Sequence, residues 1–491
     1  MSDQGIRDIV ILGGGTAGWM TAAALSRAMP GSGRRITLVE SDDIGTVGVG
    51  EATIPTIHWF NQIVGFDERQ FMAETKATYK LGIEFQGWNG HGTAYLHPFG
   101  TYGPPGDGVM FLHRLIRARI EGMDAPTEQF SLTAQAARAR RFAHPVPDRR
   151  SLLSTLGYAF HFDAGLYAGY LRKLAEAAGV RRIEGKVARI DRDAENGLVA
   201  ALTTEGGETV AGDFFVDCSG FGGLLIEGEM QAGFEDWSEW LPCDRAWAVP
   251  TPREATPTPY TRAIAMEAGW RWRIPLQHRT GNGYVFSSRY QDEQTAREAL
   301  LAALGEEPLA EPRLLRFRPG RRRRSWAGNV VAIGLSSGFL EPLESTSIHL
   351  IQSGIAKLLA LFPRHGRDTL VAEQFNRIFA QEMLDVRDFL IMHYKLTTGR
   401  TDPMWQYCQT MTVPESLAYR FEQFLASGRI MLSSDELFRD ASWFAVMDGQ
   451  GLRPRDYNPM VDTATIKDTI HHLEQVRGAI SESVTKLPFI A

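Results

Sequence analysis

Lys80 and Glu344 are the two ionisable residues whose neighbours in the sequence point most clearly to chemistry. Lys80 is part of ATYKLGI (residues 77–83), and Glu344 is part of EPLESTS (residues 341–347). A positioned ammonium group can hold a reactive electrophile, and a carboxylate can remove a proton from an intermediate. Both also have an ordinary interpretation, because most lysines are exposed and a glutamate at the start of a helix is common.

The residues around Lys80 predict a strand. Leu81, Ile83 and Phe85 alternate in the way that the buried face of a strand does. Lys80 is therefore expected on the opposite, polar face. Glu344 precedes apolar residues with helical spacing, which predict a helix that starts near Ile348.

The first forty residues predict a strand, a glycine turn, a helix and a second strand. The strand Ile9–Leu12 leads into GGGTAG (residues 13–18), which is followed by the helix Trp19–Met29 and the strand Arg35–Glu40. Glycines at these positions allow a tight turn and a close approach of the backbone to a pyrophosphate, and Glu40 can accept ribose hydroxyls. This context predicts a dinucleotide site and leaves both NAD and FAD open.

Three further strings are unusual in composition. WRWRIP (residues 270–275) places two tryptophans on one face of a strand, where they can be ordinary packing residues. GVGEATIP (residues 48–55) and GLSSGFLEPLESTS (residues 334–347) contain glycines that can bring backbone amides against a flavin ring or an anion.

The rest of the chain predicts further elements in sequence order. We expect a helix at Leu166–Ala178 that is stopped by Gly179, and a nucleotide-side strand that ends at Asp217. Strands at 262–266, 270–274 and 284–288 predict a separate sheet, and the chain becomes mainly helical after about residue 334, notably at 348–361 and 372–393. Arg321–Arg324 is expected to be a solvated loop.

Composition excludes several classes of protein. The chain has 491 residues, 44% of them hydrophobic, and a formal net charge of -6 with a pI near 6.1, which does not favour nucleic acid or a membrane as partner. Three widely spaced cysteines (Cys218, Cys243 and Cys408) predict neither disulfides nor a metal site and fit a reducing cytoplasm. No signal peptide or apolar run of about 18 residues is expected, so we predict a cytoplasmic protein.

Several of these strings together resemble the flavin-dependent tryptophan halogenase family. GGGTAGW (residues 13–19) is similar to its cofactor fingerprint, and WRWRIP matches its WxWxIP signature at Trp270, Trp272, Ile274 and Pro275. The strings that contain Gly50, Lys80 and Glu344 also match, and the similarity spans nearly the whole chain. Members acting on indole or on substrates other than free tryptophan fit the resemblance as well.

The resemblance implies a catalytic role for Lys80 and Glu344. Reduced FAD from a separate flavin reductase, oxygen and chloride or bromide would give hypohalous acid, which Lys80 would hold or carry as a haloamine. Glu344 would polarise the halogen donor or remove the ring proton. Halide would bind to backbone amides at Thr346 and Ser347, and Ser347 stands where many relatives have glycine. This departure leaves the halide preference open, with a lean toward bromide.

The cofactor residues follow from the same strings, and none of them implies a metal. They are Gly13, Gly15, Thr16, Ala17, Gly18, Glu40, Gly50, Glu51, Ala52, Gly334 and Leu343. No second fingerprint for NAD(P)H is evident, which agrees with an external reductase that acts transiently or by diffusion. A homodimer is compatible with the sequence.

The substrate pocket is less clearly marked. His97 and Phe99 are candidate pocket walls, and Trp443 offers aromatic stacking. Relatives that accept free tryptophan have a C-terminal cluster with a Tyr-Tyr pair, which this chain lacks. Indole, an indole derivative or tryptophan in a peptide are therefore all open. His393 is expected to be structural because no metal-ligand spacing surrounds it.

We expect an α/β fold with an FAD-binding Rossmann-like core of the GR2 type, an inserted β-sheet substrate lobe and a mainly helical C-terminal region. The predicted FAD module is discontinuous and comprises residues 1–60, 150–225 and 325–360. Residues 61–149 and 226–324 form the predicted substrate lobe, and residues 361–491 cap the site. The alternatives are an FAD-dependent aromatic hydroxylase that takes NADPH and a catalytically silent flavoprotein.

Overall fold

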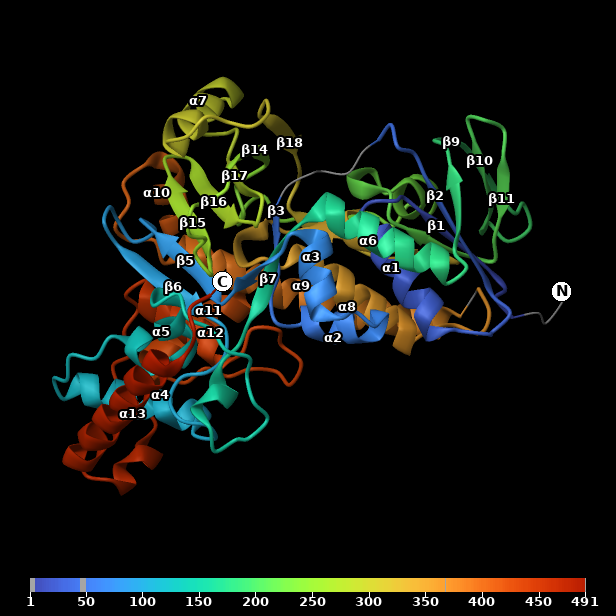
Figure 1. Ribbon diagram of the computed structural model, residues 1–491. Helices are drawn as coiled ribbons and strands as arrows, with labels where there is room; N and C mark the ends of the chain where they lie inside the picture. Colours follow the sequence, from blue (N-terminus) through green and yellow to red (C-terminus); the bar gives the residue numbers. More distant parts are fainter. Residues whose placement is uncertain (1–4, 45–49, 367, 491) are drawn as a thin grey trace. The chain divides into compact units, whose positions relative to one another are not determined.

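The computed structural model describes residues 5–44, 50–366 and 368–490 (Figure 1). The chain divides into two compact units that are interleaved along the sequence. Unit 1 comprises Met1–Ala77, Phe162–Glu239 and Leu315–Leu384, and unit 2 comprises Thr78–His161, Trp240–Leu314 and Asp385–Ala491. The three-part division proposed from the sequence stays a prediction.

Unit 1 contains a six-stranded sheet that is parallel except at one edge. Its strands, in the order β20-β21-β12-β1-β2-β8, are β20 (Trp326–Ala327), β21 (Val330–Ala332), β12 (Phe214–Asp217), β1 (Asp8–Leu12), β2 (Arg35–Glu40) and β8 (Arg181–Glu184). β1 pairs in parallel with both β2 and β12, and β20 alone runs antiparallel. Continuous apolar runs fit strands covered on both faces. The predicted strand–turn–helix–strand unit is confirmed.

The helices of unit 1 surround α1 (Thr16–Ala28), which packs against α6 (Ala164–Ala177), α8 (Ser347–Ala360) and α2 (Ile57–Val64). α3 (Glu68–Thr75) packs against α6, and α9 (Thr369–Lys395) starts in unit 1 and continues into unit 2. Asp163 caps α6 by accepting from two backbone amides, at 3.0 and 3.1 Å. Gly15 at the start of α1 supplies no such side chain, so the first turn of α1 keeps its amides for another partner.

The small strands of unit 1 form two antiparallel sheets. One has the order β11-β10-β9, and the other has the order β13-β19-β22. The strands are β9 (Val187–Arg192), β10 (Val199–Thr204), β11 (Thr209–Ala211), β13 (Phe234–Asp236), β19 (Gly320–Arg322) and β22 (Gly338–Phe339), and β3 (Gly50–Ala52) also belongs to this unit.

Unit 2 contains a larger sheet in the order β18-β14-β17-β16-β15-β5-β6. Its strands are β18 (Arg313–Arg316), β14 (Arg245–Pro252), β17 (Arg279–Phe286), β16 (Gly269–Pro275), β15 (Thr261–Met266), β5 (Gly82–Gln86) and β6 (Ala94–Pro98). β5 and β15 pair in parallel, whereas β14, β17, β16 and β15 form an antiparallel series. The three strands predicted between residues 262 and 288 are confirmed, and β5 and β6 extend their sheet.

The segment around Lys80 differs from the predicted continuous strand. β4 (Thr78–Lys80) pairs with β7 (Ala159–Asp163), whereas β5 belongs to the large sheet. The break lies at Leu81, whose amide donates to the Pro259 carbonyl at 2.7 Å. Lys80 is fully buried, so the expectation that it lies on a polar face was wrong. The reason is that Lys80 and the alternating residues lie on two different strands, β4 and β5, which a two-residue alternation cannot reveal.

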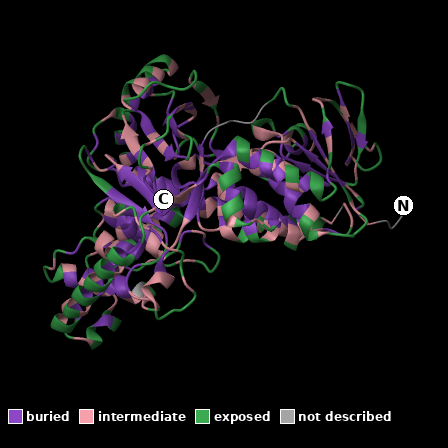
Figure 2. Cartoon of the chain, in the orientation of Figure 1, coloured by how far each residue is buried: buried purple, intermediate pink, exposed green. Residues whose placement is uncertain are grey.

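Helices make up most of the C-terminal part of unit 2, as predicted. They are α10 (Pro403–Thr410), α11 (Glu415–Ser427), α12 (Asp440–Gly449) and α13 (Ile466–Lys486), with α4 (Gly108–Ile120), α5 (Leu132–Arg138) and α7 (Glu293–Leu304) from earlier segments. α13 packs against α4 and α5, and its other side is exposed (Figure 2). The fold is α/β, with a Rossmann-like parallel sheet, additional antiparallel sheets and a helical C-terminal region.

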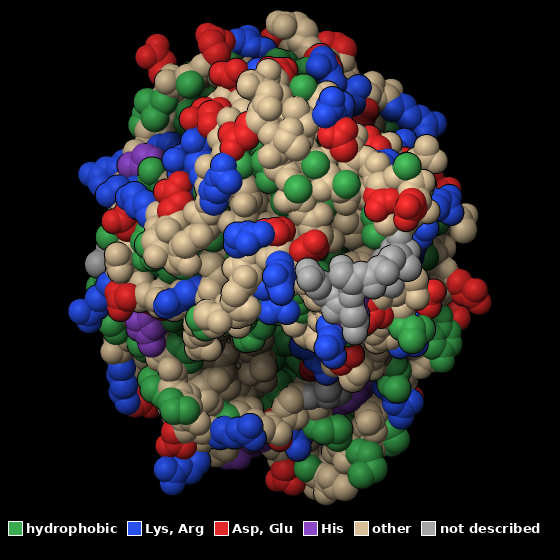
Figure 3. All heavy atoms as spheres, turned by 90° about the vertical axis from the view of Figure 1, so that its right-hand side faces the viewer, with side chains coloured by type: hydrophobic (Ala, Val, Ile, Leu, Met, Phe, Trp, Pro, Cys, Tyr) green, Lys and Arg blue, Asp and Glu red, His purple; other side chains and the backbone are tan. Residues whose placement is uncertain are grey.

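The surface charges and the three cysteines give little further information about the functional site. Acidic and basic side chains are interspersed on the face drawn in Figure 3. Cys218, Cys243 and Cys408 are buried free thiols. Within the described ranges, no helix combines the length and hydropathy needed to cross a bilayer.

Candidate active site

The glycine turn between β1 and α1 is shaped by close backbone contacts. Gly13 has φ +106°, and a Cβ there would lie 2.3 Å from the Cys218 carbonyl oxygen. A Cβ at Gly18 would lie 1.8 Å from the Gly13 carbonyl oxygen. A side chain is therefore excluded at both positions. At Gly15 a Cβ would meet no atom within 4 Å, so this position faces open space at the start of the helix.

Glu40 lies against the same turn. Its Oε1 accepts from Arg182 Nε at 2.6 Å, and a Cβ at Gly14 would lie 1.4 Å from its Oε2. The carboxylate thus has one oxygen paired with an arginine and the other directed toward the glycine turn. Ribose binding by Glu40 stays a prediction.

These features fit the diphosphate of FAD. The first turn of α1 has no capping side chain and no acidic residue, so its backbone amides and positive dipole end suit an anion. Thr16, Ala17 and Gly18 form this turn, and the open space at Gly15 leaves room for a ligand. Gly334 has φ +79°, and a Cβ there would lie 2.8 Å from Ala17 Cβ. Gly334 therefore brings the 334–347 string against the glycine turn.

The other predicted flavin contacts lie in the same unit. Gly50, Glu51 and Ala52 form β3, while Gly48 and Val49 lie outside the described residues. Burial raises the pKa of Glu51 to about 7. Leu343 is buried in a single 3-10 turn, Pro342–Glu344.

Glu344 lies just before α8, and the two candidate halide-binding residues, Thr346 and Ser347, lie at its start. Glu344 is 1% exposed, and Ser345 adopts a left-handed conformation with φ +58°. This turn lets Thr346 become the N-cap residue of α8 and Ser347 its first residue. Thr346 is fully buried, and its Oγ1 has no hydrogen-bond partner among the described residues. The amides of the first helical turn also lack partners within the helix, so the site can accept a small anion.

A buried network beside this turn was missed in the sequence. His349 Nδ1 is 2.9 Å from Thr56 Oγ1, and His349 Nε2 is 2.9 Å from Glu382 Oε1. Lys357 Nζ donates to Glu382 Oε2 at 2.8 Å. Burial alone would raise the pKa of Glu382, but the hydrogen bonds and charges of His349 and Lys357 lower it to about 2. His349 lies two residues after Ser347, and Thr56 directly follows the 48–55 string. Their closeness in sequence to these two strings is the sign that could have identified them as site residues.

In unit 2, the Lys80 side chain lies near an aromatic ring. Its Nζ lies 5.1 Å from the centre of the Phe99 ring, within the range of a cation–π contact. Phe99 and Lys80 are linked through the backbone, because the Phe99 amide donates to the Leu81 carbonyl at 2.8 Å. Phe99 is 7% exposed. The structure thus brings two of the predicted site residues together.

Hydrogen bonds connect the strand of Lys80 to the tryptophan string. Thr78 Oγ1 donates to the Pro275 carbonyl at 2.7 Å and is 3.2 Å from His161 Nδ1. His161 Nε2 is 2.9 Å from Thr261 Oγ1. Burial lowers the pKa of His161 well below its ordinary value, and the charge of Lys80 lowers it further. These partners lie on four different strands, so residue spacing gave no sign of them.

Trp270 and Trp272 share one face of β16, as predicted. Both are buried, and their ring centres are 6.3 Å apart. A Cβ at Gly283 on the neighbouring strand would lie 2.0 Å from the Trp272 ring, so glycine provides the space for that ring. Ile274 and Pro275 complete the buried string.

His97 and Trp443 belong to an aromatic cluster in unit 2. Their common neighbour is Phe389, whose ring centre is 5.8 Å from His97 and 4.9 Å from Trp443. Phe438 stacks on Phe389 at 3.8 Å. Trp443 Nε1 is buried without a hydrogen-bond partner in the described part of the chain. His393 is buried and bonded to the Phe389 carbonyl at 2.8 Å, which is the structural role expected.

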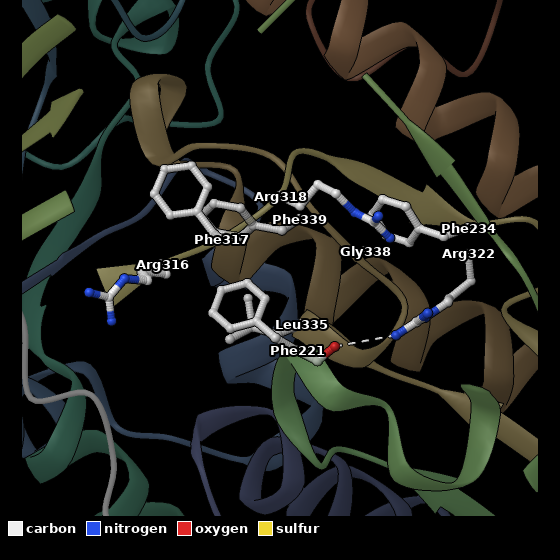
Figure 4. Close-up of a pocket in the computed structure, with 9 residues that line it drawn as sticks. All are labelled: Phe221, Phe234, Arg316, Phe317, Arg318, Arg322, Leu335, Gly338 and Phe339. Atoms are coloured by element: carbon white, nitrogen blue, oxygen red, sulfur yellow. Dashed lines mark hydrogen bonds between the residues drawn. The ribbon is translucent and has the colours of Figure 1, made fainter. Parts of the chain in front are cut away.

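A small pocket in unit 1 combines phenylalanines and arginines (Figure 4). Phe339 lies 5.3 Å from Phe221 and 4.8 Å from Phe317, ring centre to ring centre. Arg322 lines the pocket but is buried, with an ion pair to Glu227 at 2.7 Å. The prediction of a solvated loop was therefore wrong for Arg321 and Arg322, because both lie on β19, whereas Arg323 and Arg324 are exposed.

The arrangement separates two kinds of chemistry. Unit 1 holds the glycine turn, Glu344 and the anion-accepting turn at Thr346, and unit 2 holds Lys80, Phe99 and the tryptophan string. Main-chain amides dominate the first set, and buried side chains dominate the second. Such residues can bind a dinucleotide and a halide in unit 1 and hold an electrophile in unit 2.

The comparisons with known proteins agree on one family. The family model described as tryptophan halogenase matches residues 8–465. Tryptophan 6-halogenase ThaL of Streptomyces albogriseolus is 35% identical over 93% of this chain and 91% of its own, and tryptophan 7-halogenase RebH of Lentzea aerocolonigenes is 34% identical over 97% and 95%. The structure of BrvH, a flavin-dependent halogenase from Brevundimonas sp. BAL3, superimposes with a TM-score of 0.95 at 46% identity and covers 99% of this chain and 98% of its own. The chain belongs to the tryptophan halogenase family of flavin-dependent halogenases.

Proposed function

We propose that this enzyme uses reduced FAD, oxygen and a halide to make hypohalous acid, which halogenates an indole-like aromatic under the control of Lys80 and Glu344. The substrate class comprises indole, tryptophan and their derivatives. A separate flavin reductase supplies the reduced cofactor, and a homodimer stays a prediction.

The observation that carries this proposal is the complete burial of Lys80. A buried lysine loses hydration and side-chain freedom, so it is retained where a function needs it. The Phe99 ring beside its ammonium group offers an apolar wall that can also contact an aromatic substrate. An ammonium group in such a place can donate a hydrogen bond to hypohalous acid and limit which carbon it reaches.

Glu344 and the start of α8 supply the other half of the chemistry. Thr346 Oγ1 and the first-turn amides offer donors to a chloride or bromide ion. Glu344 accepts the proton that leaves the ring after the halogen adds. When bound, reduced FAD supplies the electrons that activate oxygen, and Gly13–Gly18, Glu40, Gly50–Ala52, Gly334 and Leu343 would hold it.

The pocket drawn in Figure 4 supports a flavin neighbour on unit 1. Leu335, Gly338 and Phe339 line it and also belong to the 334–347 string. Its phenylalanine rings suit a flat group, and Arg318 over the Phe234 ring at 4.1 Å adds positive charge. We infer that this pocket borders the bound flavin.

An indole without a free amino-acid group fits the chain best. The aromatic cluster of His97, Phe389 and Trp443 offers stacking surfaces, and the buried Trp443 Nε1 can donate to a substrate acceptor. BrvH and Xcc4156 of Xanthomonas campestris, each 46% identical to this chain, are flavin-dependent halogenases. We propose bromide as the preferred halide because it is more easily oxidised.

The test is mass spectrometry of indole and tryptophan after incubation with the purified chain, FAD, a generic flavin reductase, NADH and bromide or chloride. We expect a halogen isotope pattern on indole that disappears in Lys80→Ala. The matched control is Lys486→Ala, which removes a side chain that is 70% exposed and should leave the product unchanged.

Two results would overturn the proposal. An oxygenated product without halogen, accompanied by NADPH oxidation without a reductase, would indicate a hydroxylase. Flavin binding with no halide-dependent product on indole, tryptophan or a tryptophan-containing peptide would indicate a silent flavoprotein.

A further inference from the structure

We propose that His161, with Thr78 and Thr261, is a positioning residue that fixes the strand of Lys80 to the end of the tryptophan string through a hydrogen-bond relay of defined direction. The inference rests on the proposed role of Lys80 and extends it to the residues that hold the lysine in place. All participants lie in unit 2.

The direction of the relay follows from counting hydrogens. The Thr78 hydroxyl has one hydrogen, which it donates to the Pro275 carbonyl, a group that can only accept. Thr78 Oγ1 must therefore accept from His161, so the Nδ1 atom of His161 carries the proton. In a neutral imidazole Nε2 then accepts, and its partner is the hydroxyl of Thr261.

A neutral histidine is also what the surroundings demand. His161 is fully buried, and its partner strand carries Lys80, whose charge disfavours a second cation nearby. The Thr78 and Thr261 hydroxyls satisfy both ring nitrogens of the neutral form. One arrangement of hydrogens thus pairs every donor and acceptor of the relay. Reversing the direction of any single hydrogen bond would leave another group of the relay unpaired.

The relay acts on Lys80 through the geometry of β4. Thr78 and Lys80 are two residues apart on this strand, so their side chains leave it on the same face. In the ladder Thr78 pairs with His161 and Lys80 pairs with Ala159. β4 is only three residues long and ends at the break before Leu81, so its own ladder holds it weakly. Anchoring Thr78 to Pro275 and His161 therefore restricts the position of the backbone at Lys80, from which its side chain extends.

The relay also explains how the tryptophan string can influence the lysine. Pro275 is the last residue of β16, and Thr261 lies on β15, which pairs with both β16 and β5. Two strands of the large sheet, β16 directly and β15 through His161, thus fix a strand that is outside it. A displacement of Lys80 by about 1 Å would be enough to lower its control over the halogen substantially.

The first measurement needs no turnover. The full chain is labelled with ¹⁵N-histidine, and His161→Gln identifies the His161 signal among the twelve histidines. The relay requires a neutral ring with its proton on Nδ1 near pH 7. A proton on Nε2, or a doubly protonated ring, would overturn the assignment whether or not the chain halogenates indole.

The second measurement separates positioning from folding. We expect Thr78→Val to lower the halogenated product formed per NADH consumed by roughly tenfold to a hundredfold, and Thr78→Ser to restore most of it. The matched control is Thr280→Val, which removes a buried hydroxyl of the large sheet that likewise donates to a proline carbonyl, that of Pro252, at 3.0 Å. If Thr280→Val loses as much product as Thr78→Val, or if Thr78→Ser fails to restore it, the positioning role is refuted.

Discussion

The start of α8 in unit 1 and the surroundings of Lys80 in unit 2 solve different binding problems with different groups. At α8 the donors are backbone amides and one buried hydroxyl on consecutive residues. Around Lys80 the groups are side chains from β4, β7 and β15 and one carbonyl from β16, and these strands are spread along the sequence. A main-chain site is local and small, and it suits an ion or a diphosphate. A side-chain site needs the whole sheet and suits the control of a reactive species.

This difference predicts which substitutions change the binding of FAD or halide and which change where the halogen is delivered. Changes at the main-chain sites should alter affinity for FAD or halide. Changes around Lys80 should alter where the halogen goes, while flavin and halide still bind.

The largest effect on binding is expected for Gly15→Ala. Because a Cβ there meets no protein atom, the FAD-free chain should keep its melting temperature, but the methyl group would occupy space needed by the diphosphate. FAD affinity should fall by about a hundredfold, or roughly 3 kcal/mol. Isothermal titration and thermal melts measure the two quantities.

Gly169→Ala is the matched control for this change. Gly169 lies within α6, and its Cβ would also meet nothing within 4 Å. FAD affinity should stay at the wild-type value. Equal FAD affinity in Gly15→Ala and wild type would remove the glycine turn from the cofactor site.

A smaller effect is expected for Thr346→Val. The KM for halide should rise by about tenfold, the lower end of the effect expected for a hydrogen bond to an ion, which is worth roughly 1.5–3 kcal/mol. Stability should not fall, because the hydroxyl has no partner in the described protein and a methyl group of similar size replaces it. An unchanged KM together with a lower melting temperature would indicate a structural hydroxyl.

The smallest effect is a change in pH dependence at Glu51. The carboxyl has an ordinary pKa of 4.5 and a folded pKa of about 7, so it favours folding only while protonated. Its contribution to the FAD-free chain is complete below about pH 4.5 and is lost as the pH rises through 7. Glu51→Gln should therefore raise the melting temperature at pH 8 by on the order of 3–5 °C and leave it unchanged near pH 5.

The control for this pH effect is Glu195→Gln, at an exposed turn of unit 1. It should follow the wild-type curve at both pH values. A Glu51→Gln curve that runs parallel to wild type would show that burial does not shift this carboxyl.

The contrast between the two regions also explains how far the sequence could be interpreted. The strand–turn–helix–strand unit, the strands at 262–288 and the C-terminal helices were predicted because periodicity and glycines are local signals. Glu344, Thr346 and Ser347 were named from the resemblance to the halogenase family, which places them within one short string. Their roles stay predictions, as do those of the cofactor residues.

What could not be predicted depends on long-range pairing. The burial of Lys80 follows from the break at Leu81 and from strands that arrive about 80 and 180 residues later. His161, Thr261 and the His349–Glu382 network have no spacing relation to the strings they support. Arg322 was expected in solvent because an arginine run carries no sign that one member pairs with Glu227.

The most direct test measures free hypohalous acid and directed product in the same reactions. A β-diketone that hypohalous acid halogenates serves as the trap, and mass spectrometry follows indole, in wild type, Lys80→Ala and Thr346→Val. If unit 1 supports formation of the oxidant and unit 2 directs it, Lys80→Ala should retain trap halogenation while the indole product falls by about a thousandfold. Thr346→Val should lower both in parallel at limiting halide. Loss of trap halogenation in Lys80→Ala, or retention of its indole product, would contradict this division of labour.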